Sequence, residues 1–286
     1  MVLILLILSA VCHASWNIIA KGARDKLTFL WCQTAFAAIA LSLAVPWLCP
    51  APDPKGYIFL AVSGLMQAAY YYLLAKTYSI GEISVVYPLT RGSAPIFVCI
   101  FSALLGFERI TLPVFLSVLL IFAGIYIVNM NSLSVKEFTA PIRALINVPQ
   151  TRLALLNGLT VAVYTISDDR SVNYTDPLMI YWIIAVIPSV LMLPMIIKRS
   201  SIKDEISTNA PKIIIVSVLT FLAYFLVLVA MKYSEASYIS SVREMSVVLV
   251  AIYSAVKLRE NFPAPKIIGA AAIFCGIVLL SVFRAL

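Results

Sequence analysis

Long runs of apolar residues, separated by short polar stretches, set the pattern of this 286-residue chain. At a rise of about 1.5 Å per residue, an apolar helix of about 20 residues crosses a hydrocarbon core about 30 Å thick. Ten runs are long enough, and we expect helices at residues 2–20, 28–48, 56–77, 83–106, 112–130, 152–169, 177–197, 211–231, 236–257 and 265–284. The pattern therefore predicts an all-α membrane protein with ten transmembrane helices.

The composition supports this interpretation, because polar residues are too few to cover the surface of a soluble domain. Hydrophobic residues make up 62% of the chain and charged residues only 12%, whereas a soluble domain carries about 25% charged residues. The net charge of +8 comes from basic residues scattered between the apolar runs. Such scattering is typical of membrane flanks and does not indicate a nucleic-acid partner.

Residue types that support catalysis or metal binding are sparse. The chain has one histidine, His13, and five cysteines, which lie within or at the ends of apolar runs without a CxxC spacing. This set provides no multi-histidine metal site and no nucleophile paired with a base. We therefore expect no metal, no cofactor and no enzymatic activity.

A polar linker at 131–151 divides the chain into two similar halves, 1–130 and 152–286. Matching residues follow at a constant shift of 152: Arg91 with Arg243, Glu108 with Glu260, and the FAGI sequence at 122–125 with the FCGI sequence at 274–277. Each half contains five predicted spans, an odd number, so the second half enters the membrane from the opposite side. The pattern predicts two inverted five-helix repeats, an architecture in which transporters bind substrates between the repeats and alternate access.

Several short motifs support a family resemblance. They are GFE at 106–108, LRE at 258–260, HASWN at 13–17, YPLTRGSAP at 87–95, VYTISDD at 163–169 and VREMSVV at 242–248. With these motifs the chain resembles the drug/metabolite transporter superfamily, and within it the EamA-type transporters. The resemblance implies a multi-pass protein of the inner cell membrane that carries small metabolites such as amino acids or sugars, often outward, without enzymatic activity.

Two arginines, Arg91 and Arg243, lie inside predicted spans, and Arg91 shares a helix face with Tyr87. A guanidinium within a membrane helix costs about 2.5–3.5 kcal/mol on insertion scales, so each arginine needs a compensating role. One alternative is a structural pair with a buried acid. The other is a cavity in which the arginine binds a carboxylate or phosphate-like group of the cargo.

Glu244 follows Arg243 directly, and adjacent residues of a helix point about 100° apart, so these two do not form one tidy pair. Two roles remain open for Glu244. It can neutralise Arg91 across the repeat interface, or it can carry a coupling proton.

Polar stripes mark two otherwise apolar spans. The stripes are His13, Trp16 and Asn17 in the first span, and Asn157, Thr160, Tyr164 and Asp168 in the sixth. Asp168 is the candidate partner for a cavity arginine, and Tyr71 is the candidate among three consecutive tyrosines of the third span. Packing is the alternative role for these residues.

These features predict a transporter that moves a small polar metabolite, such as an amino acid or an organic anion, by alternating access in export or exchange. The cargo and the bilayer are the expected partners, proton coupling is compatible with Glu244, and both a monomer and a homodimer fit. A lipid-linked precursor flippase and a non-transporting membrane scaffold are alternatives that the sequence leaves open.

The orientation is open as well. Fourteen lysines and arginines lie on the face reached after odd-numbered spans and five on the other face. The positive-inside rule then places both termini outside the cytoplasm, whereas the family resemblance implies termini inside for many relatives.

Overall fold

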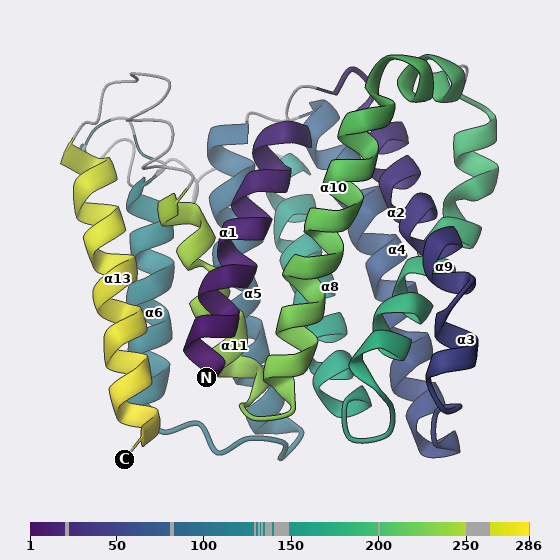
Figure 1. The fold of residues 1–286 in the computed structure, drawn as a ribbon. Coiled ribbons are helices and arrows are strands. Elements are labelled where there is room, and N and C mark those ends of the chain that lie inside the picture. The colour runs from purple at the N-terminus through teal and green to yellow at the C-terminus, as the bar shows by residue number, and fades with distance from the viewer. Residues whose placement is uncertain are drawn as a thin grey trace. The chain divides into compact units, whose positions relative to one another are not determined.

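The computed structural model consists of helices joined by short connections (Figure 1). It describes residues 1–286 apart from 21–22, 81–82, 129, 131, 133, 135–138, 140–148, 200, 250–263 and 286. The elements are α1 (Val2–Ala20), α2 (Lys26–Ser42), α3 (Val45–Leu48), the 3-10 helix η1 (Pro54–Gly56), α4 (Tyr57–Ile80), α5 (Ile83–Leu104), α6 (Leu112–Val128), α8 (Pro149–Ser171), α9 (Pro177–Ile197), α10 (Ser201–Met231), α11 (Ala236–Arg243) and α13 (Ala264–Ala285). The described residues contain no strand.

Several of these helices are long and apolar enough to cross a membrane. Among the described residues there are six such segments: Val2–Ala20, Lys26–Leu48, Pro54–Leu74, Pro177–Ile197, Ile202–Met231 and Ala264–Phe283. Two shorter apolar segments, Thr90–Leu104 and Leu112–Val128, lie in α5 and α6. A bilayer offers no water to backbone groups, and helices satisfy these groups internally. The chain is therefore a multi-pass membrane protein, and the full number of ten crossings stays a prediction.

The observed helices depart from the predicted spans in three places. The span predicted at 28–48 is interrupted, because α2 ends at Ser42 and the short helix α3 begins anew with a proline in its first turn. Helix α10 begins at Ser201 rather than 211, so the polar stretch before Pro211 is helical too. Its first turns run at a steep angle to the rest (Figure 1), as expected where a proline removes a backbone donor. The third departure is the end of α11 at Arg243, inside the span predicted at 236–257.

The described chain divides into two compact units, and each unit combines segments from both halves of the sequence. The first unit comprises Met1–Ala75 and Val163–Ser234. In it α1 packs along α10, and α2 packs against both α9 and α10 (Figure 1). A buried hydrogen bond from Ser9 Oγ to the carbonyl oxygen of Ala223, 2.6 Å long, ties α1 to α10.

Asp25 links the start of α2 to the residues that follow α9 through hydrogen bonds. As the N-cap of α2, its carboxylate accepts hydrogen bonds from the amides of Leu27 and Thr28. The same carboxylate also accepts hydrogen bonds from Nη1 of Arg199, at 3.0 and 3.1 Å. The backbone amide of Asp25 donates a hydrogen bond to Oε1 of Glu205 at 2.8 Å. Capping satisfies backbone groups that the helix itself leaves unpaired, so this contact orders the ends of three helices together.

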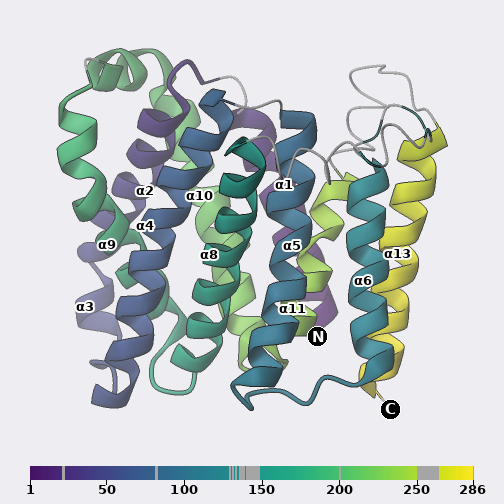
Figure 2. The same cartoon turned by 180° about the vertical axis from the view of Figure 1, so that it is seen from behind.

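The second unit comprises Lys76–Ala162 and Glu235–Leu286. Helices α6 and α13 run side by side along their length (Figure 2). Helix α5 packs against α6 and α11, and α11 also reaches α13.

Helices that the sequence duplication makes equivalent pack against each other. The pairs are α2 with α9, α5 with α11, and α6 with α13. The contact of α1 with α10 also has its counterpart, since the rings of Tyr70 on α4 and Tyr164 on α8 meet with centroids 6.0 Å apart. A two-fold relation between the halves produces this pattern, so the contacts fit a two-repeat fold.

Glycines allow the backbones of α6 and α13 to approach closely. A Cβ atom at Gly269 would lie 2.4 Å from the amide nitrogen of Val128 and 2.6 Å from the carbonyl oxygen of Gly124. A Cβ atom at Gly276 would lie 3.0 Å from the carbonyl oxygen of Ser117. Backbone atoms cannot swing aside as a side chain can, and small residues are the usual means of close helix packing in lipid.

We predict that Gly269→Ala destabilises the protein by about 1–3 kcal/mol, because the added methyl group overpacks a backbone contact. Thermal unfolding of the purified protein in detergent measures the effect. Ala271→Val is the matched control, because Ala271 is an exposed position on the same helix. Equal melting temperatures for the two variants would contradict the close contact.

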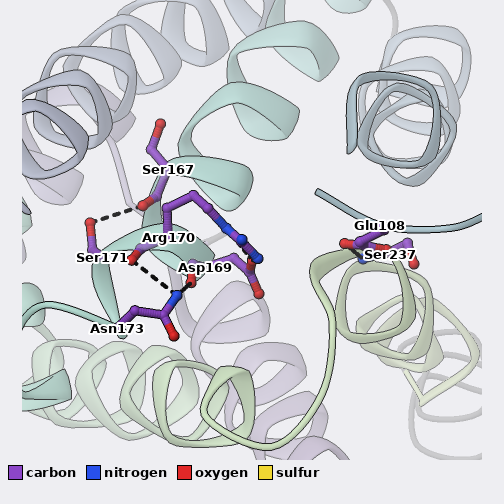
Figure 3. A network of polar contacts seen from close by, with 7 residues as sticks. All are labelled: Glu108, Ser167, Asp169, Arg170, Ser171, Asn173 and Ser237. Atoms are coloured by element: carbon purple, nitrogen blue, oxygen red, sulfur yellow. Dashed lines mark hydrogen bonds and ion pairs between the residues drawn. The ribbon is translucent and has the colours of Figure 1, made fainter. Parts of the chain in front are cut away.

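Glu108, at the corner between α5 and α6, caps α11. Its side chain is 6% exposed, and Oε1 accepts a hydrogen bond from the amide of Ser237 at 3.2 Å (Figure 3). The N-cap residue Glu235 makes no side-chain capping bond itself. A carboxylate at this end meets unpaired amides and the positive end of the helix dipole. The GFE motif therefore has a structural role, whereas its counterpart Glu260 lies outside the described residues.

Glu108→Ala should lower the free energy of unfolding by about 0.5–2 kcal/mol, since the cap is lost. Glu108→Gln should lower it less, because an amide oxygen still accepts the bond. Chemical or thermal unfolding in detergent compares both with Arg109→Ala, which changes the exposed neighbouring residue. The cap is refuted if Glu108→Ala is no less stable than Arg109→Ala.

Candidate functional site

Helix α11 breaks at the residues that the sequence analysis selected. It ends at Arg243, and Glu244 is its C-cap, with φ −68° and ψ −8° and its amide donating to the carbonyl oxygens of Ser241 and Val242. Arg243 lies in the last turn, where a positive side chain interacts favourably with the negative end of the helix dipole. Residues 245–249 are helical again, and the carbonyl oxygen of Glu244 accepts a hydrogen bond from the amide of Val247 at 3.0 Å, so the interruption is a one-residue irregularity with paired backbone groups.

Arg91 reaches this break from α5. Its Nε lies 3.7 Å from Oε2 of Glu244, and its Nη2 donates to Oγ of Ser246 at 3.4 Å. Arg91 is 8% exposed, Glu244 4% and Ser246 1%. Charge-assisted hydrogen bonds between a guanidinium and a carboxylate are about 2.7–2.9 Å long. The contact of Arg91 Nε with Glu244 Oε2 is therefore an ion pair that is longer than a charge-assisted hydrogen bond.

Arg243 belongs to the same electrostatic cluster. It is half-buried; burial of the Glu244 carboxyl disfavours its ionised form, whereas the charges of Arg91 and Arg243 favour it. With Glu244 ionised, two guanidiniums and one carboxylate give these three side chains a net charge of +1. A positive cluster in a low-dielectric interior attracts anions.

The stripe predicted on α8 is buried along its length. Asn157, Thr160, Tyr164 and Asp168 are all buried, and Thr160 Oγ1 donates to the carbonyl oxygen of Asn157 at 2.7 Å. Asp168, which is 0% exposed, accepts a hydrogen bond from the hydroxyl of Tyr224 on α10. The pairing of Asp168 with a cavity arginine stays a prediction.

Five tyrosines from four helices lie next to one another near Asp168. Ring centroids are 5.3 Å apart for Tyr70 and Tyr71, 6.0 Å for Tyr70 and Tyr164, 6.2 Å for Tyr164 and Tyr224, and 6.5 Å for Tyr224 and Tyr181. Contacts between tyrosine rings therefore join α4, α8, α9 and α10.

Asp169, the neighbour of Asp168, has a different environment. Nε of Arg170 donates to its Oδ2 at 3.0 Å, and the two side chains form an ion pair (Figure 3). Nδ2 of Asn173 donates to the carbonyl oxygen of Asp169 at 3.3 Å, and Oγ of Ser171 donates one turn back along the helix. Two adjacent buried carboxylates are therefore stabilised differently, one by a cation and the other by a tyrosine hydroxyl.

The stripe on α1 forms a local hydrogen-bonded set. Trp16 Nε1 donates to Nδ1 of His13 at 3.2 Å, and Asn17 Nδ2 donates to the carbonyl oxygen of His13 at 2.8 Å. The rings of His13 and Trp16 meet edge to face with centroids 5.0 Å apart. Trp16 is buried, and the other two are half-buried.

The predicted site residues thus fall into three sets. They are Arg91, Arg243 and Glu244 in the second unit, Tyr71, Tyr164 and Asp168 in the first unit, and His13, Trp16 and Asn17 on α1. The side chain of Tyr87 lies outside the described residues. Binding of a substrate by any of these sets stays a prediction.

The sequence analysis did not select Ser246, Tyr181 or Tyr224 for the site. Ser246 lies just beyond a helix break that the apolar pattern does not reveal. Each of the two tyrosines places a polar hydroxyl within an apolar span, and this feature can indicate a site residue. The chain has 14 tyrosines and 14 phenylalanines, however, so the feature did not separate these two tyrosines from aromatic residues that only pack.

Comparison with known proteins gives a family and a fold. The model of the EamA-like transporter family matches residues 1–130 and 152–282. No curated protein gives a significant match. A solved structure described as a crystal structure of a protein is similar with a TM-score of 0.76 and 14% sequence identity, over 99% of this chain and 96% of that one. The structural likeness supports the fold, and the family match covers nearly the whole sequence. The chain belongs to the EamA-like transporter family, within the drug/metabolite transporter superfamily.

Proposed function

We propose that the protein moves a small polar metabolite with an anionic group, such as an amino acid or an organic anion, across the inner cell membrane. Transport proceeds by alternating access, in export or exchange. Membership of the EamA-like family supports the transporter class. The cluster of Arg91, Arg243 and Glu244 is the observation that supports the substrate class. Trp16, Tyr87 and Tyr164 are the proposed aromatic walls of the path.

The ion pair of Arg91 suits an exchange of partners. A guanidinium has five N–H donors in a planar fork, which matches a carboxylate or phosphate-like group in two parallel bonds. Glu244 approaches Nε at 3.7 Å and does not form that arrangement. A cargo carboxylate that takes the place of Glu244 keeps the charge balance when Glu244 is protonated, and it gains better hydrogen-bond geometry. The membrane cost of keeping Arg91 is then offset by cargo recognition.

Glu244 supplies a route to proton coupling. When Glu244 is ionised, it competes with the cargo for Arg91; when it is protonated, the competition ends. Protonation of Glu244 therefore raises the affinity for the anion, and by linkage anion binding raises the proton affinity of Glu244 to the same extent. Glu244 alone can thus couple proton binding to anion binding, without another titrating group.

We predict that Arg91→Gln and Arg243→Gln abolish cargo binding and transport while the protein stays folded. A thermal-shift screen over amino acids and organic acids first identifies a stabilising compound, since a ligand at 100 times its Kd adds about 2.7 kcal/mol of stability. Exchange of that labelled compound in proteoliposomes then compares the variants with Arg109→Gln, an exposed control. Wild-type exchange rates in both variants would remove the arginines from the site.

We further predict that anion affinity rises as the pH falls in the wild type and becomes independent of pH in Glu244→Gln. The glutamine imitates the protonated acid, so the variant should bind the anion at least as well as the wild type does at low pH. Titration of the purified protein with the stabilising compound at several pH values measures this. A static ion pair predicts the opposite result, namely weaker binding or unfolding of Glu244→Gln at every pH.

A further inference from the structure

We propose that one end of the first unit binds the headgroup of an anionic phospholipid. At this end three stretches of the chain meet, namely residues 23–26, 198–199 and 201–212. We call it the basic end, and all of its residues belong to the first unit. The inference is independent of the proposed transport function, because it concerns contact with the bilayer rather than with cargo.

Hydrogen bonds hold the three stretches in a fixed arrangement. Nη1 of Arg199 donates to the carboxylate of Asp25 at 3.0 and 3.1 Å, and the amide of Asp25 donates to Oε1 of Glu205 at 2.8 Å. Glu205 is 2% exposed, and its Oε2 accepts a further bond from Nδ2 of Asn209 at 2.8 Å. The start of α2 and the first turns of α10 accordingly lie at the same end of the unit (Figure 1). The surface that they form is therefore held by contacts beneath it.

Three exposed cations lie on this surface. Each of the residues that link the stretches has a lysine or an arginine within two positions of it in the sequence, and these are Arg24, Lys198 and Lys203. All three are exposed, and none forms an ion pair with any residue that the structure describes. We call these three residues the basic cluster. Because the linked residues are bonded to one another, the three cations come from adjoining segments and can act on one anion.

The charge balance differs between the two ends of the first unit. The stretches of the basic end carry six lysines and arginines against three acids. Helix α9 separates this end from the opposite one, which comprises residues 53–55, 169–176 and 232–234. There the chain carries three cations and three acids, and two of the cations form ion pairs with acids. The excess of positive charge in this unit therefore lies at the basic end, where it attracts anions.

The end of α9 places the basic cluster at the level of lipid headgroups. Met195 and Ile197 are exposed, Ile197 by 64%, and Lys198 follows them directly. Exposed apolar side chains of a membrane helix contact acyl chains, and lysines or arginines at its end lie among the headgroups. Ile206, which is 48% exposed, adds apolar surface near Lys203 on α10. A phospholipid offers acyl chains to the apolar side chains and a phosphate to the cations, which a soluble anion does not.

The experiment titrates the purified full-length protein in detergent with short-chain phosphatidylglycerol and follows thermal unfolding. Phosphatidylcholine with the same acyl chains has no net charge, and glycerol phosphate has the phosphate without the chains. We expect phosphatidylglycerol to raise the melting temperature more than either of them, by a margin that shrinks at high salt because ions screen exposed charges. Equal stabilisation by the two lipids would overturn the proposal. Equal stabilisation by glycerol phosphate would overturn it too, because a soluble anion would then suffice.

Variants then assign the binding to the basic cluster. Each cation near an anionic lipid surface contributes about fivefold to affinity, so Lys198→Gln combined with Lys203→Gln should weaken phosphatidylglycerol binding by about 25-fold. Lys55→Gln combined with Lys232→Gln removes the same charge from the opposite end and should retain wild-type affinity. Arginine at positions 198 and 203 should restore binding, which a loss of folding could not explain. Retained affinity in the first glutamine pair, or equal losses in the two pairs, would exclude the basic cluster.

Discussion

Charged groups inside an apolar bundle must be balanced by the protein itself, because a bilayer offers them no water. This constraint accounts for the contacts around the buried charges of this chain. Arg91 faces Glu244, Asp169 faces Arg170, and Glu108 faces the amide end of α11. Breaking a buried pair by removal of one partner costs about 3–5 kcal/mol, whereas a cargo anion that replaces Glu244 at Arg91 leaves no bare ion once Glu244 has taken up a proton. A transporter can use this difference, since a charged cargo can replace a protein group while the bundle stays intact.

Several of these balancing contacts join the two halves of the sequence. Glu108 comes from the first half and caps a helix of the second, and Arg91 meets Glu244 in the same way. The glycine contact of α6 with α13 also pairs one half with the other. These three contacts therefore need both halves of the sequence. A two-fold relation between the halves accounts for why equivalent helices meet, since one interface then serves both halves.

Apolar periodicity predicted where helices lie, because the length of an apolar run is a local property that the membrane thickness dictates. It did not predict that α10 begins within the polar residues before Pro211, where hydropathy gives no signal. The break at Glu244 was also missed, since no proline or glycine marks it. Charge inside predicted spans selected Arg91, Arg243 and Glu244, but the hydrogen bond from Tyr224 to Asp168 could not be inferred, because partners far apart in sequence depend on how helices pack. The sequence therefore predicts which residues are candidates for the site, whereas the partners of these residues depend on how the helices pack.

The cluster of Arg91, Arg243 and Glu244 bears on which cargo the protein selects. Two guanidiniums and one carboxylate favour an anionic group. Discrimination is strongest when a missing group leaves a buried polar partner unpaired, which costs far more than a missing methylene. If this cluster binds cargo, the anionic group therefore separates the cargo from neutral molecules of similar size.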